Sequence, residues 1–431
     1  MSDATTTTPE AAAPVPAEEK VIAVVSRKTP VILGVLTVAL ALAVGLGSQD
    51  GDTGFRLATK DDFFELPKIT VPAEATAWVM IAILAVITAE SVRRMLARRT
   101  TPLWLTAIFA VVGMIGFLSW AAAGGTIPVV GLLAGSLALA VPLVFGALGG
   151  VLGERAGVVN IAIDGQLLAG AFAAALIGSI TGSVWAGIIG ALVAGALVAL
   201  ILGVFAISYF VDQVIVGVVL NVLVIGVTSF MFSQVLAPNT EDLNSPPRFS
   251  RWEIPVLGDI PLIGPILFRQ TPIVYLLYIT VAVVAWALYR TKWGLRVRAV
   301  GEHPKAADTV GINVIRTRYR TVLIAGAIAG TGGAFYTLVS VSQFNREMTG
   351  GAGYIALAAV IFGKWDPIRA TLAALLFGFA SNLQGVLSVL GSPVPSQFML
   401  MLPYVVTIFA VAGLVGRSRP PAADGLPYRK S

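Results

Sequence analysis

The stretch VWAGIIGALVAGALVALILGVFAISY, residues 184–209, decides the structural class of this protein. It runs from Val184 to Tyr209 without a single charged side chain. An α-helix rises 1.5 Å per residue, so about 20 apolar residues cross the roughly 30 Å hydrocarbon core of a bilayer. The stretch is therefore predicted to be a transmembrane helix.

The rest of the chain repeats this pattern. Of its 431 residues, 57% are hydrophobic and 12% are charged, and the mean hydropathy of +0.87 is far above that of a soluble domain. We expect an all-α, polytopic integral membrane protein with about 10–12 transmembrane or re-entrant helices. The other apolar runs lie at 31–47, 76–92, 103–123, 129–151, 157–180, 214–236, 272–289, 319–342, 354–363, 370–390 and 397–416.

Residue types that support metal or disulfide chemistry are scarce. The chain has no cysteine and a single histidine, His303, which excludes disulfides, thiolate metal sites and a histidine metal centre. We expect no metal and no cofactor in this chain.

The net charge of +6 indicates topology rather than a nucleic-acid partner. The loops 48–75 and 237–271 carry several acidic residues, whereas the denser basic clusters lie in the alternate loops. With both termini in the cytoplasm, the positive-inside rule is satisfied. The basic residues then on the cytoplasmic side are Arg93, Arg94, Arg98, Arg99, Arg290, Lys292, Arg296, Arg298, Lys305, Arg316, Arg318, Arg320, Lys364, Arg369 and Arg417.

The chain divides into four parts by composition. Residues 1–30 are rich in Thr, Ala and Pro and lack the apolar core of a signal peptide, so they are predicted to be a disordered cytoplasmic tail. Residues 31–128 hold N-terminal extra transmembrane helices, residues 129–416 a core with a cytoplasmic loop at 291–318, and residues 417–431 a second cytoplasmic tail. The run 354–363 is too short to span alone, so it is either a half-helix or extends through Lys364 and Trp365.

The cytoplasmic loop contains the signals of one short helix. Pro304 suits a first helical position and Gly311 suits the left-handed position after the last turn. We predict a helix over 304–310, held parallel to the membrane, which is a shape suited to docking on a soluble partner. The alternative is a solvated loop helix without a partner, with His303 facing solvent.

Polar residues interrupt the apolar pattern in GERAGVVNIAIDGQLLAGAF, residues 153–172. Glu154 and Arg155 are expected to pair with each other or with lipid headgroups. Asn160 and Asp164 are four residues apart, so within one helix they share a face. A buried carboxylate requires a water-filled path, Arg155 as a partner brought closer by a break near Gly157, or the N–H groups at the N-terminus of a half-helix. The stretch is therefore either part of a translocation path or an interior structural lock.

Three further polar side chains lie inside predicted spans, namely Asn221, Tyr336 and Asn382. Amide, hydroxyl and aromatic groups of this kind suit a polar solute in a translocation path. Hydrogen bonding to neighbouring helices is the alternative interpretation.

Three stretches carry a family resemblance, in the order GERAGVVNIAIDGQLLAGAF, VRAVGEHPKAADTVGINV and GGAGYIALAAVIFGKWDP. They resemble the inner-membrane permease subunits of bacterial ABC importers, in the branch for branched-chain amino acids and simple sugars, and most closely its nucleoside-type permeases. The resemblance covers roughly residues 131–416.

The resemblance implies a coupling helix within 301–311. Its Ala306, Ala307 and Gly311 match the family's Ala-Ala-x3-Gly pattern, with Gly301 and Glu302 before them. Such a helix transmits the ATP-driven closure of a partner subunit to the membrane helices. The chain has no GxxxxGK[ST] motif, so ATP is expected on a separate ABC ATP-binding subunit.

The implied function is the import of nucleosides or simple sugars by alternating access, in the bacterial inner (plasma) membrane. The expected partners are the ATP-binding subunit, a second permease that is identical or similar, the lipid bilayer, and an extracytoplasmic solute-binding protein at loops 237–271 and 344–353. No nucleic acid is expected.

Two other functional classes are alternatives to an ABC importer permease. An ion-coupled secondary transporter would use buried Asp164, although it does not need a coupling-helix loop. A membrane-embedded enzyme would need a nucleophile and base together, and no such constellation stands out. The chain itself is therefore not expected to be an enzyme.

Overall fold

The computed structural model describes residues 27–58, 66–392, 394, 395, 397, 398, 401 and 419–430. The predicted tail at 1–30 and the predicted span at 397–416 therefore lie almost wholly outside the described residues. Within them, ten helices are long and apolar enough to cross a membrane, which confirms the all-α polytopic class. These are α1 (Lys28–Leu46), α2 (Ala73–Leu96), α3 (Leu103–Ala121), α4 (Val129–Arg155), α5 (Ile163–Thr181), α6 (Val184–Gly203), α7 (Gln213–Met231), α9 (Pro272–Arg290), α12 (Val314–Phe335) and α14 (Pro367–Val389).

Shorter elements join or extend these spans. The π-helical turns η1 (Val204–Ser208), η2 (Phe232–Leu236) and η4 (Tyr336–Ser340) lengthen α6, α7 and α12, and η3 (Gly264–Phe268) lies in the loop before α9. The short helices are α8 (Thr240–Leu243), α10 (Lys292–Glu302), α11 (Pro304–Thr309) and α13 (Ala352–Phe362). The strands are β1 (Asp52–Arg56), β2 (Ile69–Pro72), β3 (Thr126–Pro128), β4 (Trp252–Glu253) and β5 (Arg269–Gln270).

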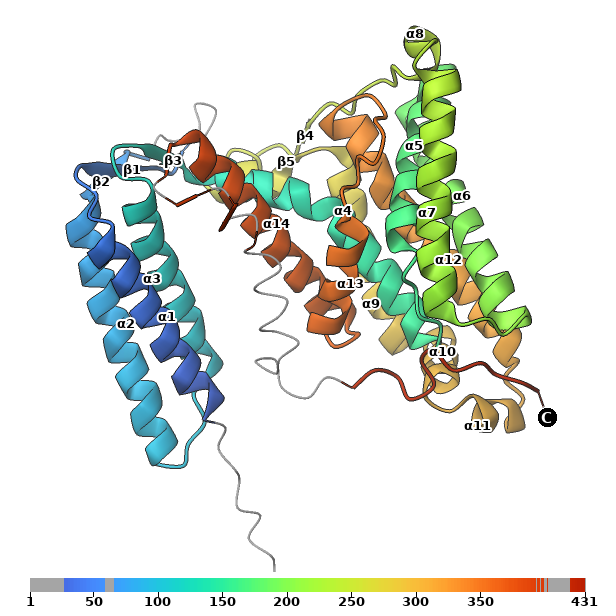
Figure 1. Ribbon diagram of the computed structural model, residues 1–431, viewed down its shortest axis with the longest axis horizontal. Helices are drawn as coiled ribbons and strands as arrows, with labels where there is room; N and C mark the ends of the chain where they lie inside the picture. The colour runs from blue at the N-terminus through green and yellow to red at the C-terminus, as the bar shows by residue number, and fades with distance from the viewer. Residues whose placement is uncertain are drawn as a thin grey trace, which may run out of the picture.

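Helices α1, α2 and α3 form a bundle to one side of the remaining helices (Figure 1). One end of this bundle carries a small sheet in the order β2-β1-β3, in which Phe55 pairs with Ile127. Leu118 and Ile127 pack there with Leu383 and Leu387 of α14. The N-terminal bundle is therefore attached to the rest of the protein through its sheet end.

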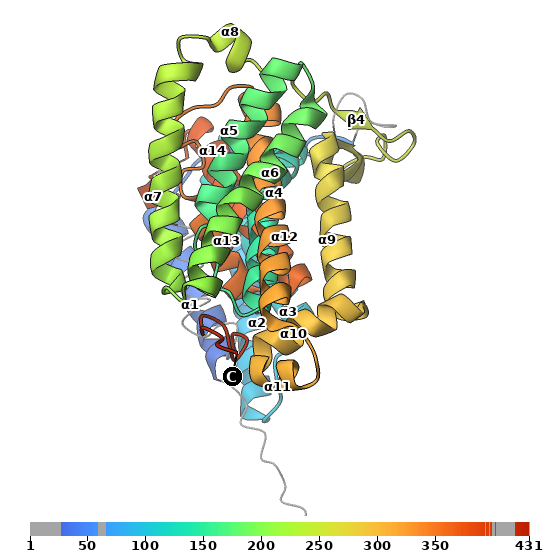
Figure 2. The same cartoon turned by 90° about the vertical axis from the view of Figure 1, so that its right-hand side faces the viewer.

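The central bundle is formed by α4, α5, α6 and α12, with α7 and α9 on opposite sides of it (Figure 2). Gly326 and Gly330 of α12 face Gly195 of α6, and a Cβ on Gly195 would lie 2.2 Å from the carbonyl oxygen of Gly326. Only glycine allows helices to approach this closely, and the resulting van der Waals contact stabilises helices within a bilayer.

The short helix α13 ends as a half-helix. Its last residue is Phe362, and the chain then turns through Lys364 and Trp365, whose φ angles of 56° and 55° are left-handed. Two successive non-glycine residues in this region cannot continue an α-helix. The half-helix interpretation is confirmed, and the extension through Trp365 is wrong.

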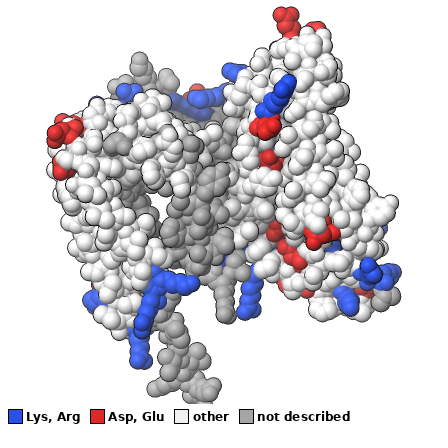
Figure 3. Space-filling view, viewed as in Figure 1, with Lys and Arg blue, Asp and Glu red and all other residues white. Residues whose placement is uncertain are grey.

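One face of the molecule carries α10 and α11, and we call it the α11 face (Figures 1 and 2). The turn between α2 and α3, with Arg98 and Arg99, lies at the same level. On the α1–α3 side, Figure 3 shows an uncharged middle, with acidic and some basic atoms at the sheet end and basic atoms at the other end. The distribution matches the charge asymmetry expected from the sequence.

Candidate functional site

The stretch between α4 and α5 is not helical. Gly157 has a φ of +81°, and α5 begins only at Ile163. Asn160 precedes that helix, so the prediction that Asn160 and Asp164 share a helical face is wrong. The side chain of Asn160 instead pairs with that of Gln166 through two amide hydrogen bonds of 3.0 and 3.2 Å. Both side chains are buried, and they hold the connecting segment against the first turn of α5.

Asp164 lies at the junction of α5 with the half-helix α13. Its Oδ1 accepts a hydrogen bond of 2.9 Å from the backbone N–H of Gly353, and its Oδ2 accepts one of 3.3 Å from Thr349 Oγ1. The N-terminus of a helix carries partial positive charge and unpaired N–H groups, which stabilise a carboxylate there. Of the partners considered for Asp164, helix N–H groups are therefore correct and Arg155 is wrong. Since a Cβ on Gly353 would lie 2.2 Å from the Asp164 nitrogen, glycine is needed at this contact.

Asn221 of α7 joins the same region. Its Oδ1 accepts from the backbone N–H of Gly165 at 2.8 Å, and its Nδ2 donates to the Ile161 carbonyl at 2.9 Å and to Tyr354 Oη at 3.1 Å. Tyr354 is 48% exposed although its hydroxyl is held by a buried amide. The structure therefore gathers Asp164, Asn221 and Tyr354 around the N-terminal end of α13.

The two remaining predicted path residues make no hydrogen bond to this group, although Tyr336 is close enough to Asp164 to interact with it electrostatically. Tyr336 begins the π-helical turn after α12 and is half-buried beside an apolar cluster that includes Phe344. Asn382 donates to the Leu132 carbonyl at 2.7 Å, so it links α14 to α4.

Sequence reasoning missed Thr349 and Tyr354. Both flank the glycines that precede α13, and that glycine-rich segment was the signal for them. In the described ranges, no group of three or more acidic or histidine side chains is arranged to hold a metal ion.

On the α11 face, the predicted short helix is confirmed as α11, and α10 precedes it. His303 caps α11 because its Nδ1 accepts from the Ala306 N–H at 3.2 Å. Gly311 has a φ of +83°, as expected for a residue that ends a helix. Ala307 is buried, whereas Ala306 is exposed and Val310 is 74% exposed. The exposed surface at α11 therefore includes Ala306 and Val310, whereas Ala307 packs against Val300 and Val314.

Helix α10 is tied to the end of α4. A Cβ on Gly301 would lie 2.1 Å from the Arg155 carbonyl oxygen, so the two backbones are in direct contact. Glu302 lies 4.0 Å from the Arg155 guanidinium through a partly exposed ion pair. Any displacement of α10 therefore acts on the α4–α5 junction.

The same junction holds the turn after α13. The indole N–H of Trp365 donates to buried Glu154, and the Trp365 carbonyl accepts from Arg155 Nε at 2.9 Å. Glu154 and Arg155 do not pair with each other, because each contacts Trp365 instead; a contact of Arg155 with lipid headgroups stays a prediction. This contact links the C-terminal end of α13 to the end of α4.

Residues 419–430 form a strap across the α11 face. The Ala423 N–H donates to the Gly301 carbonyl at 2.8 Å, and the Arg318 guanidinium donates to the carbonyls of Leu426 at 2.9 Å and Ala423 at 3.5 Å. Burial raises the pKa of the Asp424 carboxyl to about 7, against the opposing effect of Arg318. The strap therefore joins α10, α12 and the α4–α5 junction.

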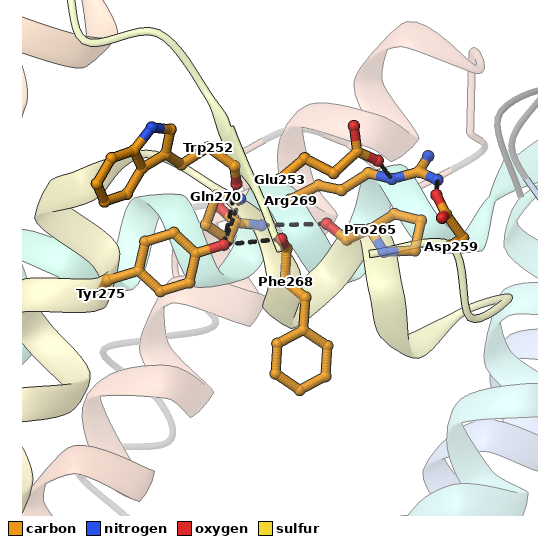
Figure 4. A network of polar contacts seen from close by, with 8 residues as sticks. All are labelled: Trp252, Glu253, Asp259, Pro265, Phe268, Arg269, Gln270 and Tyr275. Atoms are coloured by element: carbon orange, nitrogen blue, oxygen red, sulfur yellow. Dashed lines mark hydrogen bonds and ion pairs between the residues drawn. The ribbon is translucent and has the colours of Figure 1, made fainter. Parts of the chain in front are cut away.

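The face opposite the α11 face carries a loop that contains β4 and β5 and is cross-linked by polar contacts (Figure 4). Arg269 pairs with Glu253 and, at 2.8 Å, with Asp259. The Tyr275 hydroxyl lies 3.0 and 2.7 Å from the carbonyls of Trp252 and Phe268. The indole of Trp252 is 65% exposed, so the network presents an aromatic side chain to the surroundings.

A sequence profile of the family described as branched-chain amino acid transport system / permease component matches residues 132–411. The chain belongs to this family. It is thus a membrane transport component, and α1–α3 lie outside the part that defines the family.

Among similar permeases is the guanosine ABC transporter permease protein NupQ of Bacillus subtilis (strain 168), 42% identical over 68% of this chain and 95% of NupQ. The nucleoside ABC transporter permease protein NupC of Lactococcus lactis subsp. cremoris (strain MG1363) is 38% identical over 70% of this chain and 97% of its own. The putative glucose ABC transporter permease protein TsgC13 of Haloferax volcanii is 34% identical over 67% of this chain and 92% of TsgC13. No solved structure matches this permease.

Proposed function

We propose that this permease imports nucleosides, with simple sugars as the second cargo class, driven by a separate ABC ATP-binding subunit. The observation that carries the proposal is α11, a short helix presented on the face opposite the outer loops, in a chain 42% identical to a guanosine permease. NupQ and NupC are both named for nucleoside cargo and TsgC13 for glucose, which supports this order of preference.

The α11 face is proposed to be cytoplasmic and to bind the ATP-binding subunit, in a bacterial inner membrane. Apart from Arg417, which is outside the described residues, the basic residues that the sequence places in the cytoplasm lie on or beside this face, which supports both termini being cytoplasmic. Ala306 and Val310 are the proposed contacts, since both are exposed. ATP is bound by the partner, because the printed sequence carries no phosphate-binding GxxxxGK[ST] motif.

An extracytoplasmic solute-binding protein is proposed to deliver cargo to loops 237–271 and 344–353. The ion pairs of Arg269 and the hydrogen bonds of Tyr275 fix the shape of the first loop, which suits a docking surface. A second permease, identical or similar, is proposed to complete the translocation path.

Within the path we propose contacts by Tyr354 and Asn221, with Tyr336 nearby along the same bundle. Tyr354 combines a half-exposed ring with a positioned hydroxyl, which suits a base and its sugar. Asp164 is proposed to be a structural lock, because both of its oxygens are bonded to the segment that begins α13. Asn382 has a similar structural role between α14 and α4.

Movement of α11 has a continuous route to this group. Helix α10 contacts the end of α4 through Gly301 and Arg155, and Arg155 contacts Trp365 after α13. At its other end, α13 contacts Asp164. ATP-driven displacement of α11 is therefore proposed to tilt α13 against α5, which opens the path to one side and then the other.

Co-purification of the permease with its ATP-binding subunit tests the docking step. We expect Val310→Glu and Ala306→Glu to abolish the complex and the permease-dependent stimulation of ATP hydrolysis. The matched control is Arg99→Glu, which alters an exposed side chain on the same face. Normal binding by both α11 variants would refute the assignment of α11.

A further inference from the structure

The inner half of the cleft between α9 and α12 holds an apolar groove of about 310 Å³. Val283 and Ala287 line it from α9, Ile324 and Ile328 line it from α12, and Trp293 of α10 also lines it. Val283 and Ile324 are 52% and 43% exposed. The groove therefore opens outward, toward the bilayer that surrounds these spans.

Both helix faces that line the groove end in a basic residue on the side of the α11 face. On α9, Val283, Ala287 and Arg290 follow one another at spacings of four and three residues, so they share one side of the helix. On α12, Arg320 lies four residues before Ile324 on the face that contributes to the groove. Arg290 is the last residue of α9 and Arg320 lies near the start of α12, so both flank the α11-face end.

A third cation, Lys292, adjoins Trp293 at the same end, and all three basic side chains are exposed. Among the described residues, none of the three makes an ion pair with a carboxylate. The Asp366 carboxylate accepts a hydrogen bond of 2.9 Å from Tyr289 Oη of α9 and makes no ion pair with these cations. The end of the groove is therefore positively charged and uncompensated by the protein.

We propose that this groove binds an anionic phospholipid of the inner leaflet, with one acyl chain between α9 and α12 and the phosphate among Arg290, Lys292 and Arg320. The three cations at the end of an apolar groove complement an anionic headgroup joined to an acyl chain. A wholly apolar protein surface would leave these cations without a partner. Basic pockets between membrane helices on the cytoplasmic side bind anionic headgroups for the same reason. The lipid contacts Trp293, so it supports α10, which connects to the coupling helix.

A local fluorescence measurement tests this site, because the chain has no cysteine to compete for a label. The full-length permease with Val283→Cys is labelled with a fluorophore and reconstituted with phosphatidylglycerol or phosphatidylcholine that carries brominated acyl chains. We expect phosphatidylglycerol to quench the label at a several-fold lower mole fraction. The matched position is Val222→Cys on α7, which is 65% exposed and should show no preference.

Loss of the cations should remove the preference. Removal of each basic side chain is expected to weaken selective quenching about fivefold, so the preference should vanish in Arg290→Ser combined with Arg320→Ser. Arg99→Ser, on the same face of the molecule, should leave it unchanged. The melting temperature of each single and double variant shows whether its fold is intact.

Three results would overturn the proposal. They are equal quenching by the two lipids at Val283, a preference that survives the double substitution in a folded protein, and a label at Val283 that neither lipid quenches. The last result would mean that another protein chain covers the groove.

Discussion

The carboxylate of Asp164 and the backbone N–H of Gly353 form a 2.9 Å hydrogen bond across 189 residues of sequence. The bond places a negatively charged group at the N-terminus of α13, where the helix has unpaired donors and partial positive charge. A buried carboxylate in a membrane protein is thus explained by the helix that it caps.

Substitution of Asp164 separates this structural role from ion coupling. Asp164→Ala leaves the Gly353 N–H without its partner and should lower the free energy of unfolding by about 1–3 kcal/mol, measured as a lower melting temperature in detergent. Asp164→Asn keeps an acceptor oxygen and should retain ATP-driven uptake. If Asp164→Asn folds normally and yet transports nothing, Asp164 carries protons or ions and the lock is wrong.

The contact of α6 with α12 should tolerate no side chain at Gly195. Because a Cβ there would lie 2.2 Å from the Gly326 carbonyl oxygen, Gly195→Ala should destabilise the protein by about 1–3 kcal/mol through overpacking. Gly226 in α7 has no neighbouring atom within 4 Å of an added Cβ, so Gly226→Ala is the control and should be neutral or mildly stabilising. Comparable melting temperatures for the two variants would contradict the close approach of α6 and α12.

The strap at 419–430 should loosen as the pH rises. The pKa of Asp424 is raised from 3.8 to about 7 in the folded protein, chiefly by burial, so docking favours its protonated form. Below pH 3.8 Asp424 is protonated both in the docked and in the released strap, and docking is strongest. As the pH rises from 3.8 toward 7, the released strap loses this proton first, so the docking equilibrium weakens. Between pH 6 and pH 8 we expect the docking equilibrium of the strap to fall about tenfold.

Hydrogen exchange at the Ala423 amide measures this change, since that N–H donates to the Gly301 carbonyl. Protection corrected for the intrinsic exchange rate should drop between the two pH values in the parent protein. Asp424→Asn should abolish the dependence. Buried Glu154 and Arg318 also interact electrostatically with Asp424, so Glu154→Gln checks whether the titration belongs to Asp424. Equal protection of the parent and Asp424→Asn at both pH values would show that Asp424 does not control the strap.

Tyr354 should distinguish nucleosides from free sugars. An aromatic ring stacked on a base contributes about 1–3 kcal/mol, whereas a sugar offers no comparable π-face. Tyr354→Leu should therefore raise the half-saturating concentration of uridine and adenosine at least tenfold and change that of ribose much less. Tyr354→Phe keeps the ring and should lie close to the parent for uridine. If Tyr354→Leu affects all cargoes equally, the ring does not contact the base.

Local signals predicted much of the α11 face. Pro304 and Gly311 have conformational requirements that can be read from sequence, and the structure confirms the helix between them. The direction of each side chain could not be read in the same way. Ala307 belongs to the matched motif and is buried, whereas exposed Val310 was not singled out, because exposure depends on how α11 packs against α12 and the strap.

The Asp164 region shows the same limit at longer range. The sequence predicts that a buried carboxylate needs a partner and that helix N–H groups can serve. It does not identify Gly353, since that contact depends on the packing of α13 against α5. Asn160 was misplaced for a local reason: continuous hydropathy across 157–180 favours one helix, whereas the left-handed Gly157 ends α4 and the next helix begins at Ile163. The strap was missed because a short polar terminus gives no pattern that predicts docking.

The most direct test of the proposed function is uptake of labelled uridine, adenosine and ribose by proteoliposomes. The vesicles would contain this permease with its co-encoded permease, ATP-binding subunit and solute-binding protein, with and without internal ATP and a proton ionophore. We predict uptake of nucleosides that requires ATP and is unaffected by the ionophore. Uptake by this chain alone that collapses with the proton gradient would contradict the account.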